Sequence, residues 1–192
     1  MDKTWPTLQQ QLAEYTPRTR KSQEIKTKFV TFLNENKYCF ERRELSRHFT
    51  SSALLFNKQL NKILLTHHKK LDKWLQLGGH CDGNLSTLQV AILECQEESG
   101  INNISVLDNK IFDLDIHSIP KHKNVCAHYH YDICYLLKIE SDEDDIIISD
   151  ESLALRWFGI DEILNTNMDI AAKNIVEKYK NSITAPLTIL QP

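Results

Sequence analysis

The chain has 192 residues, and its 23 Lys and Arg residues nearly balance its 26 Asp and Glu residues, for a formal net charge of -3. That balance excludes the basic excess that non-specific binding to a nucleic-acid backbone requires. The sequence shows neither a signal peptide nor a membrane-spanning apolar stretch, so we expect a cytoplasmic protein that does not enter a membrane. The five cysteines are odd in number and show no C-x-x-C spacing, which predicts reduced thiols.

Residues 1 to 46 are rich in Gln, Lys, Arg and Glu, and we expect them to form a helical arm ahead of a main domain at residues 47 to 192. Thr16 and Pro17 suit the N-cap and the first position of a helix that ends near Asn36. One face of this helix is apolar and is formed by Ile25, Phe29, Phe32 and Leu33. That face either packs on the main domain or serves as a dimerisation surface, so a homodimer is one expectation.

After the arm, the pattern changes to short apolar runs separated by polar turns, which is typical of strands. The expected strands are Phe49–Phe56, Lys62–Thr66, Lys73–Leu77, Ile104–Val106, Lys110–Ile116, Val125–Ile139 and Leu153–Phe158. Helical periodicity returns between Ser86 and Ser99 and again between Met168 and Asn181. This order predicts an α+β fold, an α/β/α sandwich with a mixed sheet between helices.

Three carboxylates lie close together in the first of these helical stretches. Glu94, Glu97 and Glu98 are spaced i, i+3 and i+4, so their side chains share one helix face and repel one another. A divalent cation would offset the repulsion, and a cluster of carboxylate oxygens selects Mg²⁺ or Mn²⁺ over zinc. A solvated acidic face is the alternative reading. The neighbouring face is apolar and is expected to pack into the core through Leu88, Ala91, Ile92 and Cys95.

The segment Gly79–Ile101 resembles the signature of the Nudix hydrolases, G-x5-E-x7-R-E-U-x-E-E-x-G-U, in which U is aliphatic. The spacing matches throughout, and seven of the nine specified places are filled if Cys95 is counted as aliphatic. Leu85 stands where the family has its first glutamate, and Leu93 stands where it has arginine. The resemblance covers roughly residues 48 to 165 and implies a Nudix fold.

The resemblance implies hydrolysis of a diphosphate bond in a small-molecule substrate, a nucleoside diphosphate linked to another group. It places Gly79, Glu94, Glu97 and Glu98 at a bound Mg²⁺ or Mn²⁺. It also makes Glu97, Glu98 and Glu151 the catalytic candidates, with Glu98 or Glu151 as the base that takes a proton from water. Glu151 is included because the family has an acidic residue six places before a matching tryptophan.

The two leucines leave other readings open. If the family's glutamate and arginine share a buried network, replacing both by leucine is nearly neutral, and Leu93→Arg alone should destabilise the protein. A degenerate domain that senses a nucleotide or binds a partner is one alternative function. Another is an enzyme similar to isopentenyl-diphosphate isomerase, because Gly79 and His80 match its Gly-His pair. Gly78, however, stands where that enzyme has its catalytic cysteine.

Histidines near this segment are candidates for substrate binding. His80 directly follows the glycine pair, and strand alternation places His128, His130 and Asp132 on one face of a later strand. These side chains either line a substrate pocket or, together with His80, supply the ligands of a second metal ion.

Two lysines are further candidates for substrate binding. Lys69 and Lys70 lie in a basic stretch, residues 58 to 73, that contains one acidic residue. This stretch either steers an anionic substrate toward the site or is a solvated hairpin rim.

Overall fold

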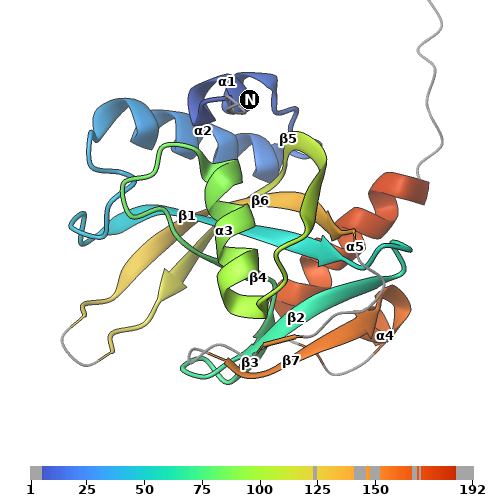
Figure 1. Ribbon diagram of the computed structural model, residues 1–192. Helices are drawn as coiled ribbons and strands as arrows, with labels where there is room; N and C mark the ends of the chain where they lie inside the picture. Colours follow the sequence, from blue (N-terminus) through green and yellow to red (C-terminus); the bar gives the residue numbers. More distant parts are fainter. Residues whose placement is uncertain are drawn as a thin grey trace, which may run out of the picture.

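The computed structural model describes residues 6–122, 125–140, 146–147, 152–165, 168 and 170–184 (Figure 1). Within these ranges, none of the helices is both long and apolar enough to cross a membrane. All five cysteines are free thiols, as their spacing predicts.

Seven strands form one mixed sheet with the central order β3-β2-β1-β6-β5. The strands are β1 (Arg47–Phe56), β2 (Lys62–His68), β3 (Lys73–Leu75), β4 (Leu77–His80), β5 (Ile104–Ile119), β6 (His128–Ile139) and β7 (Ser152–Gly159). Strands β1 and β6 run parallel at the centre, whereas β4 pairs with β1 and β7 pairs with β2 in antiparallel fashion. The sheet is therefore mixed, as predicted.

Helices cover both faces of the sheet, which confirms the predicted α/β/α sandwich (Figure 1). The helices are α1 (Leu8–Glu14), α2 (Arg20–Glu35), α3 (Thr87–Ser99), α4 (Ile160–Asn165) and α5 (Ile170–Thr184). The first three share one apolar core with the sheet, and α4 and α5 share a second core on the opposite face. We call these the α3 face and the α5 face.

The alternation of side chains along β1 explains how one strand serves both cores. Phe49, Ala53 and Leu55 belong to the core on the α3 face. Leu54 and Phe56 belong to the core on the α5 face. Because successive residues of a strand point to opposite sides, any two adjacent residues of β1 lie on different faces. The same alternation places two groups of polar side chains on opposite faces of the sheet.

The amino-terminal helices differ from the prediction in their bounds. Thr19, and not Thr16, caps α2, because its hydroxyl accepts a hydrogen bond from the Ser22 amide at 3.1 Å. Residues 8–14 form a separate helix, α1, with its own cap at Thr7. A run as short as α1 has too few turns for its periodicity to stand out in the sequence.

The apolar face of α2 packs on the sheet of its own chain. Phe29 and Phe32 are 0% and 1% exposed, and their rings lie 5.6 and 5.1 Å from the ring of Phe49. The two buried phenylalanines are therefore covered within the monomer and are not available as the dimerisation surface that was the alternative reading.

A buried polar network joins α1, α3 and β6. The Tyr135 hydroxyl donates to Gln11 Oε1 at 2.7 Å and lies 2.6 Å from the Thr87 hydroxyl. Gln11 Nε2 in turn donates to the Asn109 carbonyl at 2.8 Å. A buried polar group without a partner costs about 1–3 kcal/mol, so this network holds the two helices in a defined position on the sheet.

Two expected strand boundaries were wrong. Lys73–Leu77 is not one strand, because it divides at Gln76 into β3, which pairs with β2, and β4, which pairs with β1. Conversely, the two runs between 104 and 116 belong to one long strand, β5, whose pairing with β6 shifts register around Asp108. The polar residues at this irregularity make one strand look like two in the sequence.

Candidate functional site

The first part of the candidate site consists of β4, the loop after it and α3. Ser86 caps α3, since its hydroxyl accepts a hydrogen bond from the Gln89 amide at 3.4 Å. Gly100 ends the helix in the left-handed conformation, with φ of 73°, which glycine adopts without strain. Leu88, Ala91 and Cys95 are fully buried, so the predicted apolar stripe packs against the sheet and fixes the orientation of the glutamate face.

Glu94 and Glu98 lie against the backbone of β4. Glu98 Oε1 accepts a hydrogen bond from the Gly78 amide at 3.4 Å. The Glu94 carboxylate occupies the space next to Gly79, so that a Cβ atom at position 79 would overlap it. Both glutamates are half-buried, whereas Glu97 is exposed. The structure thus brings two of the three predicted glutamates to the glycine pair.

This arrangement fits a hard divalent cation by the chemistry of its donors. Glu94, Glu97 and Glu98 supply carboxylate oxygens from about one turn of helix, and Gly79 leaves room for a carboxylate at the backbone of β4. Mg²⁺ and Mn²⁺ take oxygen ligands of this kind. Among the residues that the structure describes, the three carboxylates do not converge as closely as three histidine nitrogens do elsewhere in the fold.

Glu151, the remaining catalytic candidate, lies outside the described residues, and β7 begins immediately after it at Ser152. The Ser152 hydroxyl lies 2.7 Å from that of Thr66 on β2. The catalytic role of Glu151 remains a prediction.

The predicted histidines gather on the α5 face, on the other side of the sheet from the glutamates. In the parallel pairing of β1 and β6, His48 is aligned with His130, and in the pairing of β1 and β4, Thr50 is aligned with His80. The ring centroids of His48 lie 5.2 Å from those of His80, 5.0 Å from His128 and 4.9 Å from His130.

His48 is the member of this group that the sequence prediction missed. It stands one residue before the start of the strand expected there, and its neighbours give no sign of a ligand. The signal that was available is a histidine next to the start of the expected strand, two residues before the polar run Thr50–Ser52. His48 can be identified as a member of the group only once it is known that β1 pairs with β6, which aligns His48 with His130.

Burial favours the neutral form of His80 and His130. It lowers the pKa of His80 to about 4, with further contributions from the charges of Arg42 and His48. It lowers the pKa of His130 to about 2, with contributions from His80 and His117. A buried imidazolium would lose its hydration and meet neighbouring positive charge, so the neutral form is favoured at neutral pH.

Asp132, which was predicted to share the histidine face, is engaged in a different way. Its carboxylate accepts hydrogen bonds from the Thr50 hydroxyl at 2.8 Å and from the Ser52 hydroxyl at 2.5 Å. Burial raises the pKa of Asp132. The aspartate therefore joins β6 to β1 beneath the histidines, and both of its oxygens already have partners.

Lys69 and Lys70 lie in the turn between β2 and β3, and both residues are exposed. Their position is compatible with a solvated rim as well as with substrate steering, and their binding role remains a prediction.

Three aromatic side chains of the sheet could stack on a base, and they differ in exposure. Tyr131 is buried in the core, the ring of Trp74 stacks on that of His67 with centroids 5.1 Å apart, and Tyr129 is 53% exposed.

Leu85 and Leu93 are both at the surface, with 64% and 41% of their area exposed. A charge at either position can reach water, so the buried network that would make Leu93→Arg destabilising has no counterpart here. The expectation that this substitution alone destabilises the protein is therefore not supported by the structure.

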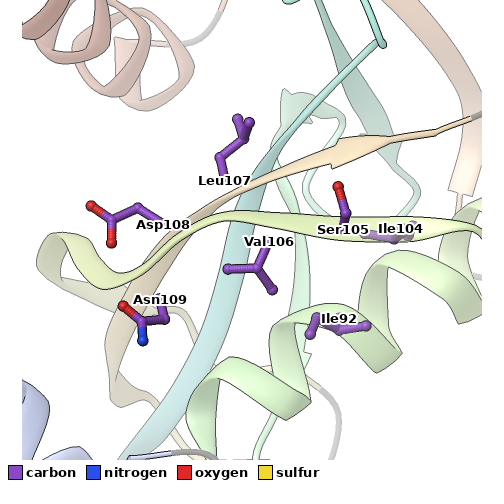
Figure 2. Close-up of a pocket in the computed structure, with 7 residues that line it drawn as sticks. All are labelled: Ile92, Ile104, Ser105, Val106, Leu107, Asp108 and Asn109. Atoms are coloured by element: carbon purple, nitrogen blue, oxygen red, sulfur yellow. The ribbon is translucent and has the colours of Figure 1, made fainter.

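An open surface cavity of about 530 Å³ lies beside α3, along the first half of β5. Figure 2 shows its lining residues, with Ile92 on the helix facing Val106 and Ile104 on the strand. None of the predicted catalytic, metal-binding or substrate-binding residues lines this cavity. We assign it no part in the candidate site.

Comparison with known proteins identifies a matching domain family and relatives of known sequence. The sequence model of the NUDIX domain family matches residues 46–179 of this chain. A bis(5'-nucleosyl)-tetraphosphatase of Rattus norvegicus is 26% identical over 106 residues, which cover 55% of this chain and 69% of that protein. A probable DHNTP pyrophosphohydrolase of Lactococcus lactis is 28% identical over 131 residues, which cover 67% of this chain and 76% of that protein.

Solved structures show the same fold. The MutT protein of Methanosarcina mazei superimposes with a TM-score of 0.57 at 17% identity, over 74% of this chain and 99% of that one. An Ap4A hydrolase of C. elegans gives a TM-score of 0.52 at 15% identity, over 70% of this chain and 96% of that one. Because the domain model covers more than half of the sequence and includes β4, α3 and the glutamates, the chain belongs to the NUDIX domain family.

Proposed function

We propose that the protein is a divalent-metal-dependent pyrophosphohydrolase that acts on a nucleoside diphosphate linked to another group. The observation that carries this proposal is the placement of Glu94 and Glu98 against Gly79 and Gly78 at the start of the family's signature segment. A helix would be more stable without these like charges, so their position at a glycine backbone favours a role in binding a cation.

Glu94, Glu97 and Glu98, together with the Gly79 backbone, would hold Mg²⁺ or Mn²⁺. Such an ion, when bound, neutralises phosphate oxygens and lowers the pKa of a coordinated water. Glu98, which is half-buried and accepts a hydrogen bond from the Gly78 amide, is one candidate for the base that would accept a proton from water, and Glu151 is the other.

The substrate class can be narrowed by what the relatives are named for. Their names refer to bis(5'-nucleosyl) tetraphosphates and to DHNTP, both of which contain linked phosphates. We therefore propose a first panel of dinucleoside polyphosphates, dihydroneopterin triphosphate, nucleoside triphosphates, ADP-ribose, NADH and CoA. Each is incubated with Mg²⁺, with Mn²⁺ and with EDTA, and release of phosphate or nucleotide is measured.

The expected result is cleavage of one substrate class that EDTA abolishes. Glu98→Gln should then lower kcat by about 10²–10⁴-fold, because it removes a general base and a charge while keeping the volume of the side chain. Glu177→Gln is the matched control, since Glu177 is exposed on α5 and lies outside the candidate site.

Two outcomes would contradict the proposal in different ways. Full activity of Glu98→Gln would remove Glu98 from the site, and a comparison with Glu151→Gln would then test the other candidate base. If no substrate of the panel is cleaved but a nucleotide binds, the alternative of a nucleotide-sensing domain is favoured.

A further inference from the structure

Three histidine side chains converge on one point of the α5 face, although they come from two different strands. His48, His128 and His130 each offer a ring nitrogen, and these three atoms all lie within 4.8 Å of one another. His128 Nε2 and His130 Nε2 are already 3.2 Å apart. Nitrogens about 2.1 Å from a tetrahedral ion lie about 3.4 Å from each other, so the Nε2 atoms of His128 and His130 are already close to ligand spacing.

Hydrogen bonds on the far side of two rings determine which nitrogen faces this point. His128 Nδ1 lies 2.9 Å from the Cys126 carbonyl, and His48 Nδ1 lies 3.2 Å from the Glu44 carbonyl. A carbonyl oxygen only accepts, so each Nδ1 carries the proton and each Nε2 of the neutral ring carries a lone pair. Histidines that bind metals are typically held in this way, with the second ring nitrogen donating to a backbone carbonyl or carboxylate.

The remaining nitrogen of His48 has no hydrogen-bond partner among the residues that the structure describes. His48 is 4% exposed, and its Nε2 atom is buried. Buried polar atoms in native proteins are nearly always satisfied, and an exception points to a bound water or ion. A buried lone pair that faces two further imidazoles has the surroundings of a metal ligand.

Two charged side chains near the histidines already have partners. Both carboxylate oxygens of Asp132 accept hydrogen bonds from Thr50 and Ser52, so the aspartate is not offered as a ligand. Arg42, the cation whose charge acts on His80, is held by Asp82 through two contacts of 2.6 and 2.5 Å. The donor atoms at this point are therefore the ring nitrogens of the three histidines.

We propose that His48, His128 and His130 bind a late first-row transition ion of the Zn²⁺ class. Imidazole nitrogen favours Zn²⁺, Co²⁺, Ni²⁺ and Cu²⁺, whereas the carboxylate oxygens of the glutamate group favour Mg²⁺ and Mn²⁺. Position 80 alternates with Gly79 in β4, so the glutamates and the histidines lie on opposite faces of the sheet. The site is thus separate from the proposed hydrolytic site and does not depend on it.

His80 borders the fourth position of this site. Its ring lies 5.0 Å from that of His130 and 5.2 Å from that of His48, and it is only half-buried. With three protein ligands, a zinc ion keeps one position open for water or another small ligand. The neighbouring imidazole of His80 either fills that position or hydrogen-bonds to what occupies it.

The test uses the protein without a histidine affinity tag, stripped with a chelator and then titrated with Zn²⁺ alone. We expect one tightly bound Zn²⁺ per chain by calorimetry and elemental analysis. We also expect a tetrahedral d–d absorption band when Co²⁺ replaces Zn²⁺. This spectrum needs no variant, so the absence of the band in the folded wild-type protein would overturn the proposal.

Asparagine variants remove the ligand atom but keep the amide donor close to where Nδ1 lies. His48→Asn and His128→Asn should weaken Zn²⁺ binding by more than the roughly 10–100-fold that loss of an outer-shell partner costs. His122→Asn, a change at an exposed histidine, and Glu98→Gln should both keep the bound zinc. Wild-type affinity in the two ligand variants would refute the site.

A different result would assign the zinc ion to the glutamates. If Glu98→Gln loses zinc while the histidine variants keep it, the glutamates are the zinc ligands and the proposal is wrong. Because the readout is metal content and not turnover, an inactive protein on the phosphate panel does not affect this result.

Discussion

The glutamate group and the histidine group lie on opposite sides of β4, and adjacent residues of that strand, Gly79 and His80, belong to one group each. The glutamates supply oxygens, and Glu97 is exposed to water. The histidines supply nitrogens in a largely buried setting, with His48 and His128 4% and 8% exposed. The two metal sites that we propose would therefore keep donors for a hard ion and donors for a softer ion on separate faces of one sheet.

After Glu98→Gln, the largest expected effect comes from Gly79→Ala, which should disable the glutamate group alone. The added methyl group overlaps the Glu94 carboxylate, so the side chain must move away from β4. A displacement of about 1 Å in a catalytic arrangement costs on the order of 100-fold in rate, and we expect a loss of that size in metal-dependent turnover.

The same variant tests whether the two groups are independent. Zn²⁺ binding to Gly79→Ala, measured by calorimetry, should match the wild type because His48, His128 and His130 are untouched. Loss of zinc together with turnover in a protein that remains folded would show that the two faces are coupled.

A second, smaller effect is expected from Tyr135→Phe, which acts on the α3 face without touching either group. The change removes the hydroxyl that bonds to Gln11 Oε1 and to the Thr87 hydroxyl, at a cost of about 1–3 kcal/mol, while Gln11 Nε2 keeps its bond to the Asn109 carbonyl. A loss of about 2 kcal/mol corresponds to a fall of roughly 4–8 °C in the midpoint of a thermal melt for a chain of this size.

Tyr129→Phe on the same strand provides the control, since that side chain is 53% exposed and should melt like the wild type. Equal melting temperatures for both variants would mean that the hydrogen bonds of Tyr135 contribute nothing measurable to stability.

The smallest effect is expected from Leu93→Arg, which restores the residue type that the family signature has at this place. The side chain is 41% exposed, so the new charge can remain in water and the change in unfolding free energy should stay within about 0.5 kcal/mol. Denaturant titration measures this directly. Leu88→Arg, at a fully buried position of the same helix, should by contrast be strongly destabilising.

The sequence predicts which residues meet when they are close together in the chain, and it does not predict contacts between distant strands. Glu94, Glu97 and Glu98 are brought together by the pitch of a single helix, so their spacing is sufficient to predict their shared face. The meeting of His48 with His130 depends on a parallel pairing between strands that lie about 80 residues apart, and local patterns do not reveal such pairings.

The layered fold was predictable because apolar runs and helical periodicity are local signals. The division at Gln76 and the continuity of β5 depend on which neighbouring strand each segment pairs with, and both were predicted wrongly. The cap of α2 at Thr19 instead of Thr16 shows a third limit, because both threonines precede a run of good helix formers.

The hydrogen bonds of Tyr135 couple the local unfolding of α1 to that of α3. Gln11 belongs to α1 and Thr87 to the first turn of α3, so separating either helix from the sheet breaks hydrogen bonds that the other shares. Backbone amides in α1 and α3 should therefore exchange with deuterium at similar rates, as one cooperative unit. Fluctuations of α1 would then also move α3, the helix that carries the glutamates, although no glutamate takes part in this hydrogen-bond network.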